Sequence, residues 1–236
     1  MKTQELKSYF NSSDVLIVEK PAGYLSVPSI LGKKDSRPVV GLIAQDQWGP
    51  LFPVHRLDLE VPGLLVFAKN SKSHKVLQHL WEKKGVKKIY RALSGLQNFS
   101  HWPENVFGAE KDFKLTSDSE LWKSKIVQGK RRSFVADHGL ESLTEYKLLK
   151  TSQSLNFWEL SPITGRRHQL RLEMSRHGFP IAGDELYGGA KVPGQDVHEI
   201  ALVASELHFH KDHRIELPEH LVLDWNWDLW ESRFNL

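Results

Sequence analysis

The pattern of apolar and polar positions predicts several short strands early in the chain. Apolar runs rich in Val, Leu and Ile over residues 14–20 and 64–68 are typical of buried strands. The first run stops at Pro21-Ala22-Gly23, and residues 29–38 contain glycine, proline and charges that predict a loop. Apolar and polar residues alternate over 88–93, which predicts a further strand.

The second half of the chain continues the strand pattern. Residues 142–149 and 155–160 predict two strands joined by a polar turn at residues 151–154, and residues 201–209 predict a last strand. Between these regions, residues 97–130 show no clear period and are expected to be irregular.

Two segments have helical spacing. The first begins at Asn70 or Ser71, either of which can cap a helix. Its apolar positions recur as one helical face, at Val76, Leu77, Leu80 and Trp81. The second is expected over residues 166–176, after Thr164-Gly165. A glycine ends each helix, Gly85 the first and Gly178 the second.

Strands therefore outnumber helices, and they do not alternate regularly with them. This order favours an α/β (α+β) fold with a mixed, largely antiparallel central sheet and flanking helices, rather than a doubly wound parallel sheet. A chain of 236 residues is long enough for one domain or two closely packed subdomains, and we interpret residues 1–236 as a single domain.

Composition narrows the class of protein. The absence of cysteine excludes disulfides, thiolate-bound zinc and iron–sulfur clusters, and fits a reducing compartment. The first residues lack the apolar core of a signal peptide, and no apolar run approaches the roughly 20 residues that span a membrane. We therefore expect a cytoplasmic protein.

Charge is distributed unevenly along the chain. Residues 69–91 contain seven lysines and one arginine against a single glutamate. A second basic block has no acid: Lys123, Lys125, Lys130, Arg131 and Arg132. Residues 216–231 hold five acids and neither lysine nor arginine. This asymmetry predicts a basic face for phosphates and a solvated acidic region, although charge runs are also common on ordinary soluble faces.

Two segments concentrate residues suited to chemistry. Asp58 follows Arg56 at a turn that leads into the apolar run 64–68, and polar loop residues at strand ends often perform catalysis. In the helix expected at 166–176, Arg167 and Arg171 are four positions apart and would share a face that favours anions. Arg171 lies between two leucines, which predicts partial burial and a need for an acidic partner. Asp58 is the candidate for this acidic partner.

Several motifs together resemble the RluA family of RNA pseudouridine synthases. Their letters are HRLD at 55–58, KIYRA at 88–92 and TGRRHQLR at 164–171, the last followed by GFPIAGDELYG at 178–188. KPAG at 20–23 and the apolar segment 201–209 extend the resemblance over about residues 14–218, leaving 219–236 as a C-terminal extension. The resemblance implies the catalytic domain only, without the family's frequent N-terminal RNA-binding module.

The resemblance also implies a site. Asp58 matches the catalytic aspartate, Tyr90 the tyrosine under the target base, and Arg171 the arginine paired with the aspartate. Arg56 matches an arginine associated with the displaced nucleotide. The remaining substrate-binding candidates are His55, Lys88, Arg166, Arg167 and Leu170. The family's central RNA-binding cleft, an RNA partner with a structured stem-loop, a monomeric state and the absence of any metal or cofactor are expected as well.

The chemistry itself needs one carboxylate. Isomerising uridine breaks the bond from nitrogen 1 to the ribose and joins carbon 5 in its place. An ionised aspartate can attack the sugar or the base, or abstract a sugar proton, and the residues do not choose among these routes. A tyrosine ring can stack on an extruded base. Ribosomal and transfer RNA both remain open as substrates.

Departures from the family pattern and rival interpretations also bear on the function. Val61-Pro62 stands where Thr-Ser is frequent, and Glu173 where histidine is common, so we expect altered packing or RNA contacts rather than lost catalysis. His208, His210 and His213 complete no zinc pattern, and we expect no structural metal. Three C-terminal tryptophans are expected to anchor the chain end: Trp225, Trp227 and Trp230. The rivals are a catalytically silent RNA-binding protein and a glycosidase, which commonly needs two carboxylates.

Overall fold

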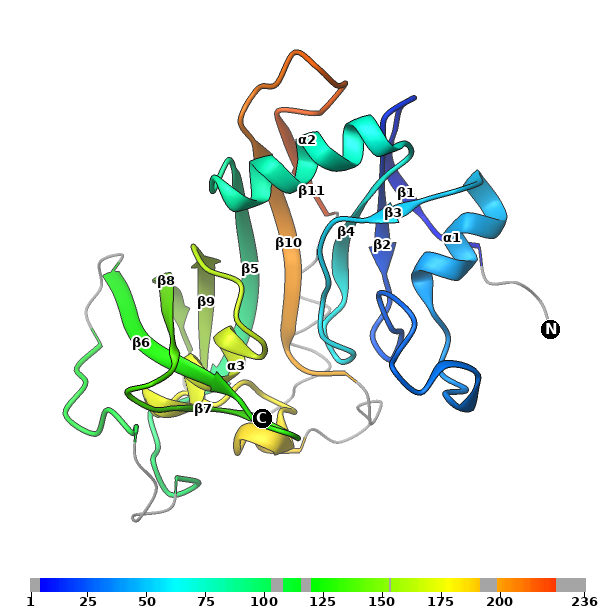
Figure 1. The fold of residues 1–236 in the computed structure, drawn as a ribbon. Coiled ribbons are helices and arrows are strands. Elements are labelled where there is room, and N and C mark those ends of the chain that lie inside the picture. The colour runs from blue at the N-terminus through cyan, green and yellow to red at the C-terminus, as the bar shows by residue number, and fades with distance from the viewer. Residues whose placement is uncertain (1–4, 103–107, 116–119, 153, 192–198, 224–236) are drawn as a thin grey trace. The chain divides into compact units, whose positions relative to one another are not determined.

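The computed structural model describes residues 5–102, 108–115, 120–152, 154–191 and 199–223 (Figure 1). These residues form two compact units. Among the described residues, the first unit comprises 5–88 and 204–223, and the second comprises those from 89 to 203. This division into units does not test the expectation of a single domain, which stays a prediction. The three C-terminal tryptophans lie outside the described residues.

The first unit is a mixed sheet built around a fully buried strand. Its strand order is β1 (Ser8–Asn11), β2 (Val15–Lys20), β4 (Gly63–Ala68) and the part of β10 (Leu202–Phe209) that starts at Ala204. β3 (Phe52–Pro53) pairs with β4, and β11 (His220–Val222) pairs with β10. All six residues of β4 are buried, as the continuous apolar run predicts.

Two features fix β4 in this sheet. It runs antiparallel to β2 and meets β10 in parallel, with Gly63 opposite Ala204. Gly63 has φ +133°, and a Cβ there would lie 2.3 Å from the Ala204 carbonyl oxygen, so this close approach requires glycine. The sheet is thus pinned at the point where the Asp58 loop enters it.

The helices of the first unit differ in how clearly the sequence marks them. α2 (Ser71–Glu82) packs on β3 and β4 and starts as predicted, because the Asn70 side chain accepts a hydrogen bond from the Ser73 amide at 2.8 Å. α1 (Val40–Trp48) was not predicted, since Val39 at its N-cap provides no side-chain cap. A single 3-10 turn, η1 (Gly32–Lys34), interrupts the expected loop.

The second unit is an antiparallel sheet with an aromatic core. Its order is β5 (Val86–Gly95, from Ile89 onward), β9 (Leu155–Pro162), β8 (Leu140–Thr151), β6 (Glu120–Gln128) and β7 (Ser133–Val135). The helices are α3 (Gln169–Arg176) and the 3-10 turn η2 (Glu185–Tyr187). The rings of Trp122 and Tyr146 stack at 4.2 Å, and Phe179 meets Trp158 edge-on at 4.9 Å.

The predicted strands are confirmed; β4 and β10 pair in parallel, whereas β2–β4, β5–β9, β6–β8 and β8–β9 are antiparallel. Three predictions were wrong. β6 lies inside the segment expected to be irregular, and β11 follows the strand expected to be last. α3 begins three residues later than expected, at Gln169, so Arg167 precedes the helix and does not share a face with Arg171 on it. Among the described helices, none is long and apolar enough to cross a membrane.

Candidate active site

The loop that bears Asp58 is held on both sides by the segment that follows β2. On the N-terminal side, the Leu57 amide donates a hydrogen bond to Ser26 Oγ at 3.0 Å, and Ser26 Oγ donates to the Leu57 carbonyl at 3.0 Å. On the C-terminal side, the Gly23 amide donates to the Leu59 carbonyl at 2.9 Å. The backbone of Asp58 is therefore anchored at the residue before it and at the residue after it.

Lys20 is the second anchor of the same loop. Its side chain is fully buried at the end of β2, and Nζ donates to the carbonyl oxygens of Pro21, Tyr24 and Leu59 at 2.9, 2.8 and 3.1 Å. Three acceptors match the three hydrogens of an ammonium group, so the buried charge is well satisfied. Lys20 thereby ties the end of β2 to the residue that follows Asp58.

The charges around Lys20 connect it electrostatically to the candidate aspartate. Burial lowers the pKa of Lys20 to about 7, and the negative charges of Asp58 and Glu60 counteract part of that effect. Because Coulomb attraction is mutual, a charged Lys20 also favours the carboxylate form of Asp58. Lys20 was not among the residues predicted to be functional. The available signal was a lysine that ends a strand which begins with four apolar residues.

His55 has a structural role in this loop. Its Nε2 accepts a hydrogen bond from the Val66 amide at 3.1 Å, and its ring stacks on Trp81 with centroids 5.1 Å apart. Burial and the nearby charge of Lys88 lower the pKa of His55 to about 3, so the ring is neutral at pH 7. These contacts fit a hydrogen-bonded scaffold group, and direct binding of RNA by His55 stays a prediction.

The two cations of this region differ in exposure. Arg56 is exposed, which leaves its guanidinium accessible to a nucleotide. Lys88 is only partly exposed, and burial lowers its pKa to about 8. Lys88 therefore differs from the exposed lysines around it in the sequence, among them Lys83, Lys84 and Lys87.

The second unit contains the other two proposed catalytic residues. Tyr90 lies on β5 opposite Leu160 of β9 and is partly exposed. Arg171 lies on α3 and is 2% exposed, as its position between two leucines predicted. Asp58 belongs to the first unit, so a site that includes all three residues stays a prediction.

A buried carboxylate holds the Arg171 side chain. Arg171 Nε donates to Asp184 Oδ2 at 2.7 Å and Nη2 to Asp184 Oδ1 at 2.8 Å. This two-point contact fixes one edge of the guanidinium, and the ring of Tyr187 lies 5.5 Å from its Cζ. Asp58 was the acidic partner expected from the sequence. Asp184 was missed, although it stands close to two glycines in the matched segment 178–188.

The segment that supplies Asp184 is itself fixed to α3 and β7. Tyr187 Oη accepts a hydrogen bond from the Ser133 amide at 2.8 Å and lies 3.1 Å from His168 Nδ1. Ser175 Oγ of α3 donates to the Tyr187 carbonyl at 2.7 Å. His168 is therefore part of a hydrogen-bonded scaffold. The position of Arg171 is thus set by contacts within the second unit.

The remaining substrate-binding candidates differ in their contacts with the rest of the chain and in their exposure. Arg166 Nε donates to the Glu141 carbonyl at 2.8 Å, and Arg167 donates to the carbonyls of Gly129 and Arg131 at 3.0 and 3.2 Å. Both arginines thus use part of their donor set on backbone carbonyls, Arg166 on β8 and Arg167 on the turn between β6 and β7. Leu170 is 6% exposed, which leaves little of it to touch RNA. RNA contact by these three residues stays a prediction.

Both departures from the family pattern are buried. Val61 and Pro62 lie in the core of the first unit, where the Pro62 carbonyl accepts a hydrogen bond from the Ala204 amide at 3.0 Å. Glu173 is fully buried in the second unit and accepts hydrogen bonds from Ser124 Oγ and Arg176. The departures are therefore packed inside their units, and the expected change in packing or RNA contacts stays a prediction.

The basic blocks lie on solvent-exposed surfaces of each unit. In the first unit, α2, the turn after it and the start of β5 expose Lys72, Lys75, Lys83, Lys84 and Lys87. In the second, strand β6 and the turn to β7 expose Lys123, Lys125, Lys130, Arg131 and Arg132. On β6 these lysines alternate with the buried Trp122 and Ile126, so strand periodicity directs them to solvent.

Comparison with solved structures defines the class of this fold. The human RNA pseudouridylate synthase domain containing 4 protein matches with a TM-score of 0.68 and 21% identity, over 97% of this chain and 92% of that chain. Its counterpart, domain containing 1, matches with a TM-score of 0.66 and 20% identity, over 98% and 96% of the two chains. The fold is thus that of pseudouridylate synthase domains.

The sequence assigns the family. Residues 14–176 match the family model for RNA pseudouridylate synthase, and the chain belongs to that family. The chain is 31% identical to the uncharacterized RNA pseudouridine synthase YhcT of Bacillus subtilis, over 78% of this chain and 58% of that protein. It is 32% identical to the dual-specificity RNA pseudouridine synthase RluA of Vibrio vulnificus, over 75% of this chain and 67% of that protein.

A third relative is ribosomal large subunit pseudouridine synthase D of Borreliella burgdorferi, 33% identical over 76% of this chain and 53% of that protein. The chain therefore matches between about half and two thirds of the length of these relatives.

Proposed function

We propose that this chain is an RNA pseudouridine synthase that isomerises specific uridines of ribosomal or transfer RNA, with Asp58 as the catalytic carboxylate. The observation that supports it most directly is the anchoring of the Asp58 loop by Ser26 on Leu57 and by Lys20 on Leu59. A catalytic group has to be held in place before the substrate arrives, and this loop is held through its backbone on both sides. Membership of the pseudouridylate synthase family supplies the reaction.

The reaction is an isomerisation and balances without a co-reactant. The bond between nitrogen 1 of uracil and carbon 1 of the ribose breaks, and the base turns. Carbon 5 then bonds to the ribose, the proton on carbon 5 leaves, and nitrogen 1 gains one. Asp58 can serve as nucleophile toward the sugar or base or as the base that takes a sugar proton.

Tyr90 and Arg171 complete the proposed site. The Tyr90 ring would support the extruded base, and its hydroxyl would help to remove the proton from carbon 5. Arg171, held through Nε and Nη2 by Asp184, would favour the ionised form of Asp58. Extruding the base costs a few kcal/mol, and this cost is smallest in a loop, which favours a stem-loop substrate. The exposed lysines would bind the phosphates.

Tritium release from RNA labelled at carbon 5 of uridine tests the proposal directly, because the isomerisation replaces the bond from carbon 5 to that hydrogen with a bond to the ribose. The substrates are ribosomal and transfer RNA isolated from a strain that lacks this protein. Asp58→Asn should abolish release while RNA binding persists. The matched control is Glu60→Gln, which removes a carboxylate two residues away on the same turn and should retain release.

Two results would contradict the proposal. Full release by Asp58→Asn would remove Asp58 from the mechanism. No release by the wild-type protein on either RNA pool, together with tight binding of RNA, would favour the silent RNA-binding protein instead. Mapping the new pseudouridines in the treated RNA would identify the target uridine.

A further inference from the structure

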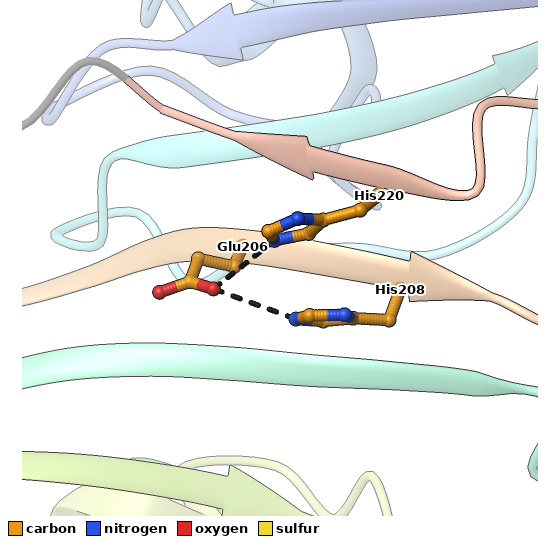
Figure 2. Close-up of side chains that lie close together, drawn as sticks. All are labelled: Glu206, His208 and His220. Carbon is orange, nitrogen blue, oxygen red and sulfur yellow. Dashed lines mark hydrogen bonds and ion pairs between the residues drawn. The ribbon is translucent and has the colours of Figure 1, made fainter.

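Three side chains of metal-ligating type meet on the β10–β11 pair, and none of them is among the site residues discussed above. Glu206 and His208 are two positions apart on β10 and therefore point to one face. His220 of β11 lies directly opposite His208 in the strand register. Figure 2 shows both imidazoles directed at the Glu206 carboxylate, with dashed lines from each ring to one oxygen. We call these three residues the Glu-His-His cluster.

The donor atoms lie close together. His220 Nε2 lies 3.2 Å from Glu206 Oε2, and His208 Nε2 lies 3.4 Å from the same oxygen. One ligand atom from each residue can be chosen so that all three lie within 4.8 Å of one another. The two imidazole rings stack with centroids 4.0 Å apart and an interplanar angle of 18°.

We propose that the Glu-His-His cluster binds a divalent transition-metal ion, with zinc the best match. Imidazole nitrogen and carboxylate oxygen are zinc ligands. Three protein ligands, with water in the fourth position, are enough to hold a zinc ion. In a tetrahedral site with bonds of about 2.0–2.1 Å, neighbouring ligand atoms are about 3.4 Å apart. The two nitrogen–oxygen distances in the cluster already have that length.

Binding requires only local movement of the two rings. Each Nε2 lone pair lies in the plane of its own ring, and the two ring planes are nearly parallel, so the rings must turn for both lone pairs to converge on one ion. The torsion that turns an imidazole has broad minima. The side chains of His208 and His220 are 41% and 45% exposed, which leaves space for this rotation. The Glu206 side chain is only 16% exposed, so it has less freedom to move than the two histidines.

The site would link two strands that otherwise share a short pairing. β11 has three residues and pairs with β10 through Glu206–Val222, Leu207–Leu221 and His208–His220. An ion held by ligands from both strands would stabilise this pairing, because it binds the folded state. The cluster differs from the histidine set considered in the sequence, since His220 replaces His210 and His213.

Titration of the tag-free protein with zinc chloride tests the site. The wild-type chain should bind one zinc ion, which isothermal calorimetry or competition with a chromophoric chelator would count. His208→Gln and His220→Gln should each weaken binding by at least the roughly 10- to 100-fold that losing a ligand's supporting partner costs. The matched control is His213→Gln, because His213 is an exposed histidine in the connection between the same two strands.

A second measurement keeps the proposal falsifiable if one variant folds poorly. Zinc should raise the melting temperature of the wild type and of His213→Gln, and should leave that of Glu206→Gln and His220→Gln unchanged. Cobalt bound in place of zinc should show the visible absorption of a tetrahedral site. The proposal is overturned if the wild type binds no stoichiometric zinc, or if it binds zinc with an affinity that His208→Gln and His220→Gln do not change.

Discussion

The ammonium group of Lys20 donates a hydrogen bond at 3.1 Å to the carbonyl oxygen of Leu59, the residue that follows Asp58. The same group donates to Pro21 and Tyr24, so one buried charge joins the end of β2, the segment after it and the candidate catalytic loop. Lys20 is a positioning residue in this arrangement, since it acts on Asp58 through the backbone and through its charge.

Lys20→Met should therefore lower kcat more than RNA affinity. Methionine fills a similar volume but removes one donor from each of three carbonyl oxygens, of which that of Leu59 keeps the Gly23 amide. The cost is about 1–3 kcal/mol for each group left unsatisfied. We expect a lower melting temperature and a large loss of kcat, with KM nearly unchanged. Lys83→Met, which alters an exposed lysine of the same unit, is the control. Wild-type kcat in Lys20→Met would exclude a positioning role.

The pair formed by Arg171 and Asp184 leads to a second prediction. Arg171→Ala would leave the Asp184 carboxylate, 1% exposed, without its two guanidinium hydrogen bonds. Breaking a buried pair by removing one partner costs about 3–5 kcal/mol, which urea denaturation can measure. Activity should fall as well, because the proposed partner of Asp58 is removed.

A double-mutant cycle separates these effects. Adding Asp184→Asn to Arg171→Ala removes the stranded charge and should recover part of the lost free energy of unfolding, without recovering activity. If Arg171→Ala melts and turns over like the wild type, the pair supports neither fold nor catalysis.

Exposed lysines near α2 should set the salt dependence of RNA binding. Reversing Lys83, Lys84 and Lys87 to glutamate should weaken binding and reduce the slope of log affinity against log salt by about one for each phosphate that is no longer neutralised. Lys88 is omitted from this set, because it is partly buried and its pKa is lowered to about 8. Reversing the exposed Lys7 serves as the control, and an unchanged slope in the triple variant would place the RNA elsewhere.

Acid should destabilise the second unit through His177. This ring is 4% exposed, stacks on Trp122 at 4.4 Å and donates from Nδ1 to the Glu173 carbonyl at 2.7 Å. Burial lowers its pKa from 6.5 to about 3. Between these values the unfolded chain binds more protons than the folded chain, so the free energy of unfolding falls as pH falls from 6.5 toward 3.

Comparison with His177→Gln isolates this contribution. Wild type should lose about 2 kcal/mol more than the variant between pH 7 and pH 5, at 1.36 kcal/mol for each pH unit below the unfolded pKa. Burial raises the pKa of Glu173, which acts in the opposite sense, but Glu173 is present in both proteins. Parallel pH profiles of the two proteins would show that His177 is not protonated on unfolding.

The strands and the Asp58 loop could be predicted because their signals are local. β4 is an uninterrupted apolar run, α2 has a capping residue and an apolar face, and both match the structure. β6 was missed because one of its inward positions is polar: Ser124 stands between the buried Trp122 and Ile126 and donates to the buried Glu173. In the sequence alone, a serine at that position indicates an exposed site. In the structure, its hydroxyl donates to Glu173 of α3.

The sequence by itself determined the family, the mixed and largely antiparallel sheet, and the identity of Asp58, Tyr90 and Arg171 as candidates. These features depend on residue type and on spacing within short segments. Only the tertiary structure decided that Asp184 holds Arg171, that Lys20 anchors the Asp58 loop, and that Glu206, His208 and His220 meet. The physical reason is that a buried charge takes its partner from wherever the fold brings one within hydrogen-bonding distance, and separation along the chain does not encode that distance.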